Sequence, residues 1–339
     1  MTLFKYVGPE RIDILTKGQI RFSQAEVWND PFELQPCYQD HIEKNVLKQF
    51  AELGKILNDY HKEGKIPTLE EIDRFEYERK RITKDDVYRY LNKKIVSLSL
   101  TESKENLLMW SHYTNNHKGF VMELDTDSDF FKSPGRCLHK VNYCIDRPKV
   151  NTTEFAELIL QLSNLLHERH EVPSSLLDEL SNVFKKGSDW CYEKEWRLIT
   201  TTESAINFQS FKKNLNTIYI TGEDLEKHYV ALFQLPLEII SAIYIGERAP
   251  DSVKRKLYLL TKYNPLYSHI KLVSTKIDKN EYKLSYSVLE AWDVLKAAEV
   301  NIDIAKVTYK QRFTNPYLNS YYKEIMEIKK MKPLNITAK

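Results

Sequence analysis

Glycine is scarce in this chain, and its copies form no phosphate-binding loop. Only nine of the 339 residues are glycine, and neither G-x-G-x-x-G nor G-x-x-x-x-G-K-S/T occurs. Both loops need glycine because their backbone approaches the phosphates of a nucleotide closely. The sequence therefore argues against a Rossmann domain and against a P-loop domain.

Paired cysteines and long apolar runs are absent as well. The four cysteines stand singly without a C-x-x-C pair, which argues against a zinc ribbon and a dithiol redox centre. No stretch approaches the ~20 apolar residues that span a bilayer, and the first residues lack the order of a secretory signal. We therefore expect reduced cysteines, no membrane partner and a cytoplasmic protein.

No charge of one sign dominates the sequence. Lys and Arg number 50 against 48 Asp and Glu, a net charge of +2, so the overall charge does not favour a nucleic-acid partner. Residues 301–339 do lean basic. A solvated helical face and a patch that binds nucleic acid both explain this local excess.

Strands and helices are predicted in separate blocks. Strands are predicted from alternating or β-branched runs at residues 3–7, 19–23, 94–100, 119–125, 137–144, 195–201, 216–221, 240–246 and 270–277. Helices are predicted where apolar residues recur at helical spacing, at residues 9–18, 104–113, 154–168 and 174–186. Because the two kinds of element do not alternate regularly, we expect an α+β fold and not a doubly wound sheet.

We expect one α+β domain over residues 1–290. Helical segments interrupt its strands at about 41–94 and 152–187, and we interpret them as insertions. Residues 291–339 follow as a basic helical extension.

The first of three polar boxes is "RFSQAEVWNDPFE", residues 21–33. Asn29 and Asp30 before a proline are good turn formers, because short polar side chains bond the local backbone while proline fixes the next φ. The density of polar residues beside a strand end, Arg21 and Glu33 included, also fits a ligand site or ion pairs. Turn and pocket are both open interpretations.

The second box is "LLMWSHYTNNHKGF", residues 107–120. Ser103 is predicted to cap a short helix, which places Leu107, Trp110 and Tyr113 at helical spacing towards the core. An aromatic side chain at such a position is either part of the core or a platform for a ligand ring. We expect Trp110 to form part of the wall of the pocket, and the core remains the other interpretation.

Two histidines of this box lie five residues apart. We expect His112 to lie on a different helix face, towards a site, and His117 to face solvent in the turn. A zinc site would require both to converge, but helical zinc ligands stand at positions i and i+4 on one face. We therefore expect no metal at these histidines.

The third box is "DWCYEKEWRLIT", residues 189–200. If the whole box is a strand, Glu193, Glu195 and Arg197 share one face, because side chains alternate with a period of two. Such a row is a common ion-pair ladder. Two carboxylates ~7 Å apart by strand geometry also suit a ligand that carries positive charge. Both interpretations are open.

Together the boxes resemble a bacterial family known only as domain of unknown function 2971. The likeness covers roughly residues 3–288 and rests on a K-Y opening strand and the motifs F-N-D-P-F-D/E, L-M-W-S-H-Y-x-x-x-H-x-G and Y-E-x-E-W-R. The corresponding positions here are Lys5 and Tyr6, then residues 28–33, 108–119 and 192–197. The chain departs from the pattern at Trp28, where phenylalanine is usual, and in its basic tail. The family label itself implies no activity.

The order of motifs is also distantly similar to that of ADP-ribosyltransferases, which implies a split β-sheet core with helical insertions and NAD as the substrate. In both, a strand with a polar residue, a helix and a second strand precede a later strand with glutamate. Glu193 and Glu195 resemble the E-x-E element of one branch. Lys5 or Tyr6 stands where an arginine or histidine is usual, and Arg21 is a candidate replacement.

This resemblance implies roles for the acidic pair. Breaking the nicotinamide bond of NAD passes through an oxocarbenium-like ribose, which a fixed carboxylate stabilises electrostatically. Glu195 is expected in that role, and Glu193 as the base that orients or deprotonates the accepting nucleophile. Arg21, or else Lys5, is expected at the pyrophosphate, since a guanidinium binds that group through two hydrogen bonds.

Further candidates for binding NAD flank these groups. Tyr6, Trp110 and Tyr113 are candidates for stacking on its rings, and His112 is a candidate for a ribose hydroxyl or a phosphate. The full set of expected binding residues is Lys5, Tyr6, Arg21, Asn29, Asp30, Trp110, His112, Tyr113 and Arg197. The bacterial resemblance further implies a toxin or phage-defence effector that modifies a macromolecule, nucleic acid or protein, with an antitoxin or defence-system partner.

Two other classes of function are compatible with parts of the sequence. Asp30, Glu33, Glu193 and Glu195 would hold magnesium in a metal-dependent nuclease, because carboxylate oxygens are ligands that this ion prefers. A non-catalytic module that binds nucleic acid or protein would use the tyrosines and lysines of residues 301–339.

Overall fold

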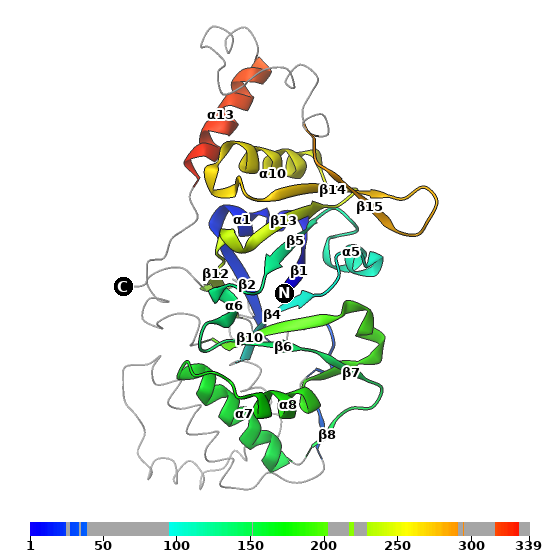
Figure 1. Ribbon diagram of the computed structural model, residues 1–339, viewed down its shortest axis with the longest axis vertical. Helices are drawn as coiled ribbons and strands as arrows, with labels where there is room; N and C mark the ends of the chain where they lie inside the picture. Colours follow the sequence, from blue (N-terminus) through cyan, green and yellow to red (C-terminus); the bar gives the residue numbers. More distant parts are fainter. Residues whose placement is uncertain are drawn as a thin grey trace.

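The computed structural model describes residues 1–24, 28–33, 35–38, 95–150, 152–202, 217–219, 229–290, 294 and 316–331. Eleven strands of these residues form one sheet, and among them only β13 and β14 pair in parallel. Helices lie against this sheet and at both ends of the molecule (Figure 1). The predicted α+β class is confirmed. The helical insertion expected at about 41–94 lies outside the described residues.

One arm of the sheet is built around β1 (Thr2–Val7). β1 pairs over its whole length with β5 (Phe120–Asp125), and β5 pairs on its other edge with β13 (Ile240–Ile245). The arm ends with β14 (Lys271–Ile277) and β15 (Leu284–Val288). All but one residue of β13 are buried, so both faces of this arm are covered at its centre.

The other arm is built around β4 (Ile95–Thr101). β4 pairs over its whole length with β10 (Glu195–Thr201), which pairs in turn with β6 (Cys137–Lys140). The remaining strands of this arm are β2 (Gln19–Gln24), β12 (Tyr229–Gln234) and β11 (Thr217–Tyr219), in that order.

The two arms meet only at the end of β4, on the edge that β4 also shares with β2 of its own arm. Thr101 at the end of β4 pairs with Phe4 of β1. Val96 and Ser97 near its start pair with β2. Between these contacts, residues 98–100 have no partner on this edge among the described strands, since β10 occupies the opposite edge. The sheet therefore divides here, and backbone groups of the open edge must find other partners.

The main apolar core lies between the inner faces of the arms and the helices that cover them. The helix predicted after β1 begins as the 3-10 helix η1 (Pro9–Ile12) and continues as α1 (Asp13–Lys17). It ends at Gly18, whose φ of 65° is left-handed and costs glycine little. The core cluster includes side chains from α1, from α6 (Asp129–Lys132) and from both arms.

Two helices, α7 (Thr152–His167) and α8 (Ser174–Val183), pack against β10 and β6 and form a second apolar cluster with them. Both helices were predicted, although the second ends early. It ends because residues 185–187 form β9 (Lys185–Gly187), which pairs with β7 (Asn142–Cys144). The smaller elements are β3 (Cys37–Tyr38), β8 (Lys149–Val150), η4 (Leu237–Ile239) and η5 (Pro265–Tyr267).

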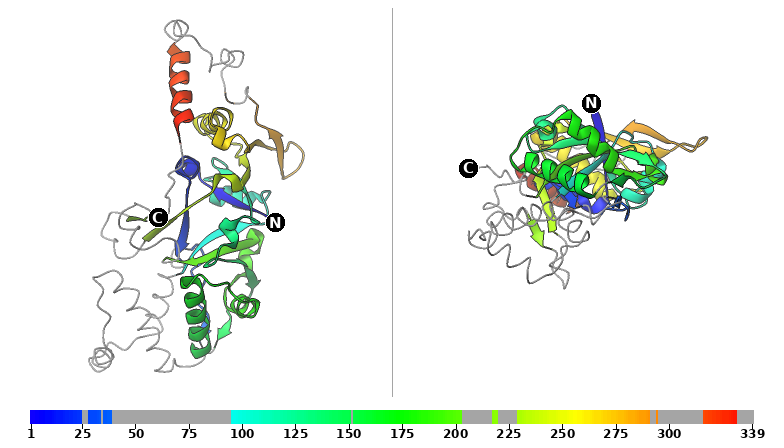
Figure 2. Two further views of the ribbon diagram at one scale, coloured as in Figure 1. Left: turned by 60° about the vertical axis from the view of Figure 1, so that its left-hand side comes forward. Right: turned by 90° about the horizontal axis from the view of Figure 1, so that it is seen from below.

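At the opposite end of the molecule, α13 (Pro316–Lys330) packs against α10 (Asp251–Tyr263), as Figures 1 and 2 show. Ile328 of α13 is buried in the main core. Asn264 donates from Nδ2 to the carbonyls of Ile328 and Met331, each at 2.9 Å, and so satisfies acceptors at the end of α13. The described helix of the basic tail is therefore docked on the sheet domain. None of the described helices has the length and hydropathy that crossing a bilayer requires.

Helix α5 (Leu107–Tyr113) begins later than predicted. Its N-cap is Asn106, whose side-chain oxygen accepts from the amide of Met109 at 3.1 Å. Ser103, the predicted cap, lies instead in the loop after β4, where its amide donates to Thr101 Oγ1 at 3.1 Å. Asparagine and serine are comparable N-caps, so the residue type alone does not decide between them.

Candidate active site

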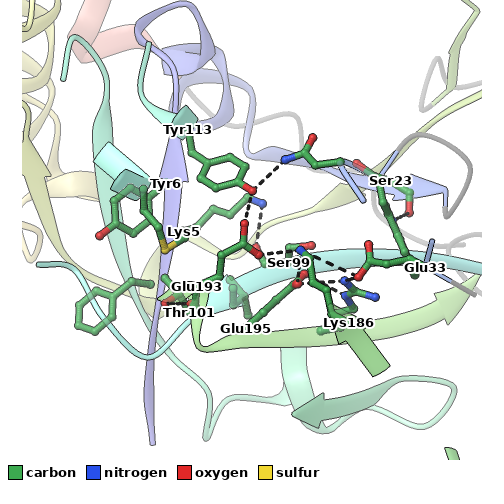
Figure 3. A pocket seen from close by; sticks show the side chains of 16 residues that line it. Lys5, Tyr6, Ser23, Glu33, Ser99, Thr101, Tyr113, Lys186, Glu193 and Glu195 are labelled. Atoms are coloured by element: carbon green, nitrogen blue, oxygen red, sulfur yellow. Dashed lines mark hydrogen bonds and ion pairs between the residues drawn. The ribbon is translucent and has the colours of Figure 1, made fainter. Parts of the chain in front are cut away.

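The division of the sheet opens a cavity of about 180 Å³ between β1 and β4. Its walls come from β1, β4, β9, β10, the first box and α5, and Figure 3 shows their side chains around it. Seven residues of the expected NAD site lie on this wall: Lys5, Tyr6, Asn29, Tyr113, Glu193, Glu195 and Arg197. Segments far apart in the sequence therefore meet at the branch of the sheet.

The third box reaches the cavity through a turn and not as one strand. The 3-10 helix η3 (Ser188–Glu193) is followed by Lys194, whose φ of 44° is left-handed, and β10 starts only at Glu195. The Thr101 hydroxyl donates to the carbonyl of Glu193 at 2.6 Å and holds the turn. The strand predicted before Glu195 is therefore wrong. Both carboxylates nevertheless face the cavity, because the turn aims Glu193 to the same side.

Lys186 on β9 lies between the two carboxylates. Its Nζ is 2.7 Å from Glu193 Oε2 and 3.1 Å from Glu195 Oε2, with Glu33 Oε1 at 4.0 Å. Burial alone would lower the pKa of Lys186, but the three carboxylates outweigh burial and raise it. The sequence analysis missed Lys186, because a lysine at the end of an amphipathic helical pattern gives no sign that it is buried.

Arg197 holds Glu195 from another side. Its Nε is 2.9 Å from Oε1 and its Nη2 is 2.9 Å from Oε2, and Nη2 also pairs with Glu33. The guanidinium lies over the Trp28 ring, with its Cζ 4.1 Å from the ring centroid. Burial alone would raise the pKa of Glu195, but Arg197 and Lys186 hold it well below its usual range. The sequence analysis left open an ion pair between the carboxylates of the third box and Arg197. The pair of Arg197 with Glu195 is present, and it is buried.

The two carboxylates differ in how much of their acceptor capacity is used. An ionised carboxylate offers about four lone-pair sites. Glu195 accepts three hydrogen bonds, two from Arg197 and one from Lys186. Within the described residues, Glu193 accepts two, from Lys186 and Tyr113. Glu193 therefore keeps more acceptor capacity for a ligand than Glu195.

Tyr113 links the first box to the third. Asn29 Nδ2 donates to the Tyr113 hydroxyl at 2.8 Å, and this hydroxyl donates to Glu193 Oε1 (Figure 3). Burial and then the contact with Glu193 raise the pKa of Tyr113, so the hydroxyl keeps its proton at neutral pH. This chain of donors fixes the orientation of the Glu193 carboxylate.

The first box is both a turn and a part of the wall. Asp30 is buried, and its Oδ1 accepts from the amide of Phe32 at 2.9 Å, as in an Asx turn. Asp30 is not on the cavity wall, whereas Asn29 and Glu33 are. The turn interpretation therefore applies to Asp30, and the pocket interpretation applies to Asn29 and Glu33.

Lys5 reaches the cavity from β1, at the point where this strand leaves β4. Its Nζ donates to the carbonyl of Ser99 at 2.8 Å, which is a backbone acceptor on the open edge of β4. The side chain keeps some exposed surface, but protein surrounds its ammonium. This burial lowers the pKa of Lys5 to about 8, since the charges of Glu195 and Glu193 compensate only in part.

Three further nominated residues lie off the wall. Trp110 is fully buried and donates from Nε1 to the carbonyl of Lys104 at 2.7 Å, so it is a core residue and not part of the cavity wall where it was a candidate. His112 is exposed and outside the wall, because the next position of α5 is the one that faces the cavity. The expectation that His112 faces the site is therefore not met. Arg21 lies on the same strand face of β2 as Ser23, which does line the cavity.

His117 is not the solvent-facing residue that was predicted. Its φ of 64° follows those of Asn115 and Asn116, 53° and 56°, so three residues in succession are left-handed. This turn stacks the His117 ring on that of Trp110, with centroids 6.0 Å apart and an angle of 7° between planes. The two histidines do not converge. In the part of the chain that the structure describes, no three His, Cys, Asp or Glu side chains form a group that could hold a metal ion.

Comparison with known proteins finds a match to one family model, and the function of that family is unknown. Residues 109–198 match the model of the protein family of unknown function DUF2971. The predicted resemblance is confirmed over these residues, which include Tyr113, Lys186 and the third box up to Leu198, while the first box lies outside the match. No curated protein and no solved structure matches the chain.

Proposed function

We propose that the protein cleaves the bond between nicotinamide and ribose in NAD and transfers the ADP-ribose to a macromolecule. The observation that carries this proposal is the pair Glu193 and Glu195, which face one cavity beside the aromatic side chains of Phe4 and Tyr6. The division of the sheet next to its acidic strand supports an ADP-ribosyltransferase-like core. With the bacterial resemblance, we extend the proposal to a toxin or phage-defence effector whose acceptor is nucleic acid or protein.

The acidic cluster suits the charge that this reaction develops. When the C1′–N bond breaks, its electron pair leaves with nicotinamide, and positive charge develops on the ribose. Carboxylates that are already fixed beside the ribose lower the barrier, because they need no reorganisation. Three carboxylates and two cations form the cluster. Burial raises the pKa of Glu33, whereas Arg197 and Lys186 hold that of Glu195 well below its usual range, so Glu195 supplies a fixed negative charge. The accepting nucleophile then bonds to C1′ and gives up a proton.

The hydrogen bonds favour Glu193 over Glu195 for contact with the substrate. Glu195 was the first choice from the sequence, but Arg197 and Lys186 already bond both of its oxygens through three hydrogen bonds, whereas Glu193 accepts two. In this proposal Glu195 and its cations supply a fixed field, and Glu193 binds the ribose hydroxyl or accepts the proton of the nucleophile. Tyr113 positions Glu193 for this task.

The cavity has room for one end of NAD and not for the whole dinucleotide. Its volume is about 180 Å³, whereas sites that enclose a cofactor measure ~300–1,000 Å³. We propose that the nicotinamide riboside end enters and that the diphosphate stays at the mouth. Arg21 is the candidate for the diphosphate, because it extends the strand face of Ser23 beyond the cavity wall.

Release of nicotinamide from NAD, measured without added metal, tests the proposal. The wild-type protein should release nicotinamide, and Glu193→Gln should lower the rate about a hundredfold or more, because the variant keeps the size and loses the base. Glu123→Gln is the matched control, since Glu123 bonds Ser241 and Tyr244 away from the cavity. Unchanged turnover in Glu193→Gln would overturn the assignment.

A magnesium-dependent nuclease is the second candidate. Glu33, Glu193 and Glu195 line one cavity and carry the hard oxygen ligands that such an enzyme uses, but among the described residues they do not form a group that could hold a metal ion. The Lys186 ammonium also lies 2.7 Å and 3.1 Å from two of these carboxylates, in the place that the metal ion would need. Cleavage of RNA or DNA that depends on magnesium, without nicotinamide release, would favour this candidate.

A non-catalytic binding module is the third class. Deleting residues 301–339 is a poor test of it, because the deletion removes Ile328 from the core. Exposed Lys329 and Lys330 at the end of α13 allow a cleaner one. Nucleic-acid binding that weakens and loses salt dependence when both become glutamine, and that Glu193→Gln leaves unchanged, would favour the module.

A further inference from the structure

Lys5 lies on the cavity wall but takes no part in the ion pairs of the acidic cluster. Its Nζ donates to the Ser99 carbonyl at 2.8 Å, and it forms no ion pair with a carboxylate of the described residues. An ammonium has three donors, and Ser99 takes one of them. Figure 3 shows the side chain extending towards Tyr113 and the Glu193 carboxylate. The amine is therefore held in place on the cavity wall and keeps two donors beyond the one that Ser99 takes.

The surroundings of Lys5 do not suit an anion. Three carboxylates share the cavity with it, and of the charges that act on Lys5 that of Glu195 is the strongest, ahead of Arg11, Glu193 and Arg21. Lys186 and Arg197 also line the cavity, but they are already paired with these carboxylates. An anionic ligand against Lys5 would meet repulsion from the carboxylates. A neutral ligand that becomes positive when it bonds to the amine would instead be stabilised by the same carboxylates.

The amine itself is suited to act as a nucleophile. Burial brings the pKa of Lys5 to about 8. The fraction of neutral amine at neutral pH is then about a hundredfold larger than for an exposed lysine with a pKa of ~10.4. A desolvated amine that is partly neutral is the form in which lysine attacks carbonyl carbon. Among neutral ligands, a carbonyl compound is therefore the one that this geometry favours.

We propose that Lys5 forms an imine with the aldehyde of an open-chain sugar. The identity of the sugar rests on the proposed function, since transfer of ADP-ribose to water leaves a ribose hemiacetal that opens to an aldehyde at C1. A cavity of about 180 Å³ admits this ribose end. The bound imine would hold the product at the site until water hydrolyses it.

The condensation needs no reactant beyond the amine and the aldehyde. The nitrogen lone pair bonds to the carbonyl carbon, and the carbonyl oxygen takes up the proton that the nitrogen loses, which gives a carbinolamine. Its hydroxyl is protonated and leaves as water while the nitrogen forms the C=N bond. Tyr113 and Glu193 already share a hydrogen bond beside Lys5 and can supply and remove these protons. One aldehyde and one amine give one imine and one water.

Reductive trapping on the full-length protein tests the inference. The protein is incubated with ADP-ribose and cyanoborohydride at neutral pH, and peptide mass spectrometry locates the secondary amine. We expect one adduct per chain, on Lys5, formed roughly tenfold faster or more than on any exposed lysine. Lys5→Arg should lose the adduct, because a guanidinium keeps the charge but is not a nucleophile. Lys17→Arg, on the exposed surface of α1, should keep it.

The pH dependence of trapping separates Lys5 from surface lysines. Its rate should level off above about pH 8, whereas rates at exposed lysines should keep rising towards pH ~10.4. Adducts spread over exposed lysines, or an adduct on Lys5 no faster than theirs, would overturn the inference. The adduct is mapped on the wild-type chain, so this result does not depend on how a variant folds.

The same preparation is assayed for nicotinamide release from NAD, so that two failures can be told apart. Release of nicotinamide without an adduct on Lys5 would overturn the imine alone. An adduct on Lys5 without any release of nicotinamide would overturn the proposed NAD cleavage and leave an aldose-binding amine.

Discussion

Lys186 and Lys5 line the same cavity and lie in opposite electrostatic environments. Lys186 Nζ has two carboxylate oxygens within 3.1 Å, and its pKa is raised. Lys5 bonds one backbone carbonyl, and its pKa is lowered to about 8. Both ammonium groups lose hydration on burial, so the partners decide the result. The difference indicates that burial lowers the pKa of a lysine where no carboxylate forms an ion pair with its ammonium.

Strand positions explain which lysine receives carboxylates. Lys186 lies on β9, directly before the turn that aims Glu193 and Glu195 into the cavity. Lys5 lies on β1 where the sheet divides, and its ammonium bonds the Ser99 carbonyl on the open edge of β4. The branch of the sheet therefore determines the charge state of Lys5 and also creates the cavity.

The largest expected effect comes from removing the paired lysine. Lys186→Met leaves the buried carboxylates of Glu193 and Glu195 short of one cation, which should lower the free energy of unfolding by ~3–5 kcal/mol. Lys5→Met removes a charge that burial disfavours and should cost clearly less. Urea unfolding at neutral pH measures both values. If both variants lost the same free energy of unfolding, the proposed difference between Lys186 and Lys5 would be wrong.

The next effect is the pH dependence of stability that Lys5 produces. Its folded pKa of about 8 lies below the ordinary 10.5, so between these pH values the unfolded chain binds more protons than the folded one. Stability from this group therefore rises with pH across that range, by on the order of 2–3 kcal/mol. The free energy of unfolding of the wild type minus that of Lys5→Met should rise accordingly. A difference that stays constant with pH would show that Lys5 is not perturbed.

A smaller effect is expected at the link between the boxes. Tyr113→Phe removes the hydroxyl that joins Asn29 to Glu193 and should cost ~1–2 kcal/mol of stability. Release of nicotinamide should fall roughly tenfold through kcat, with KM little changed, because Glu193 stays in place but loses its orientation. Asn29→Ala is the matched variant, since it removes the outer donor and leaves the bond to Glu193. A wild-type kcat in Tyr113→Phe would remove its positioning role.

The smallest effect is expected at an exposed lysine, which calibrates the other two. Lys17 pairs with Asp13 at 3.6 Å, and both side chains are exposed. Lys17→Met should change the free energy of unfolding by less than ~0.5 kcal/mol. Urea unfolding under the conditions used for Lys186→Met gives the value. A loss of several kcal/mol here would mean that replacing any lysine by methionine is costly, and the contrast would lose its meaning.

Sequence patterns predicted most elements near the site, because alternation and β-branching are local. The strand β10 was predicted with the residues that it has, and β5 and β13 within one residue at one end. The three boxes were singled out because polar and aromatic residues gather in them, and all three contribute to the wall. Local composition was therefore enough to nominate most of the residues around the cavity.

Long-range features of the site could not be predicted in the same way. No side-chain pattern encodes that one edge of β4 is shared by two strands, because each strand pairs locally like any other. Lys186 had no signal, since its partners come from other elements. His112 was assigned to the site for its residue type, but the helix phase turns Tyr113 inward instead. The charge pairing of Glu195 likewise depends on Lys186 and Arg197 arriving from two different strands.

A crystal structure with a non-hydrolysable NAD analogue tests most directly whether the cavity at the branch of the sheet is the substrate site. We expect the ribose of the nicotinamide end inside the cavity, with a hydroxyl within hydrogen-bonding distance of Glu193, and the diphosphate outside it near Arg21. An analogue bound elsewhere on the protein, with the contacts of Glu193 unchanged, would contradict the proposal.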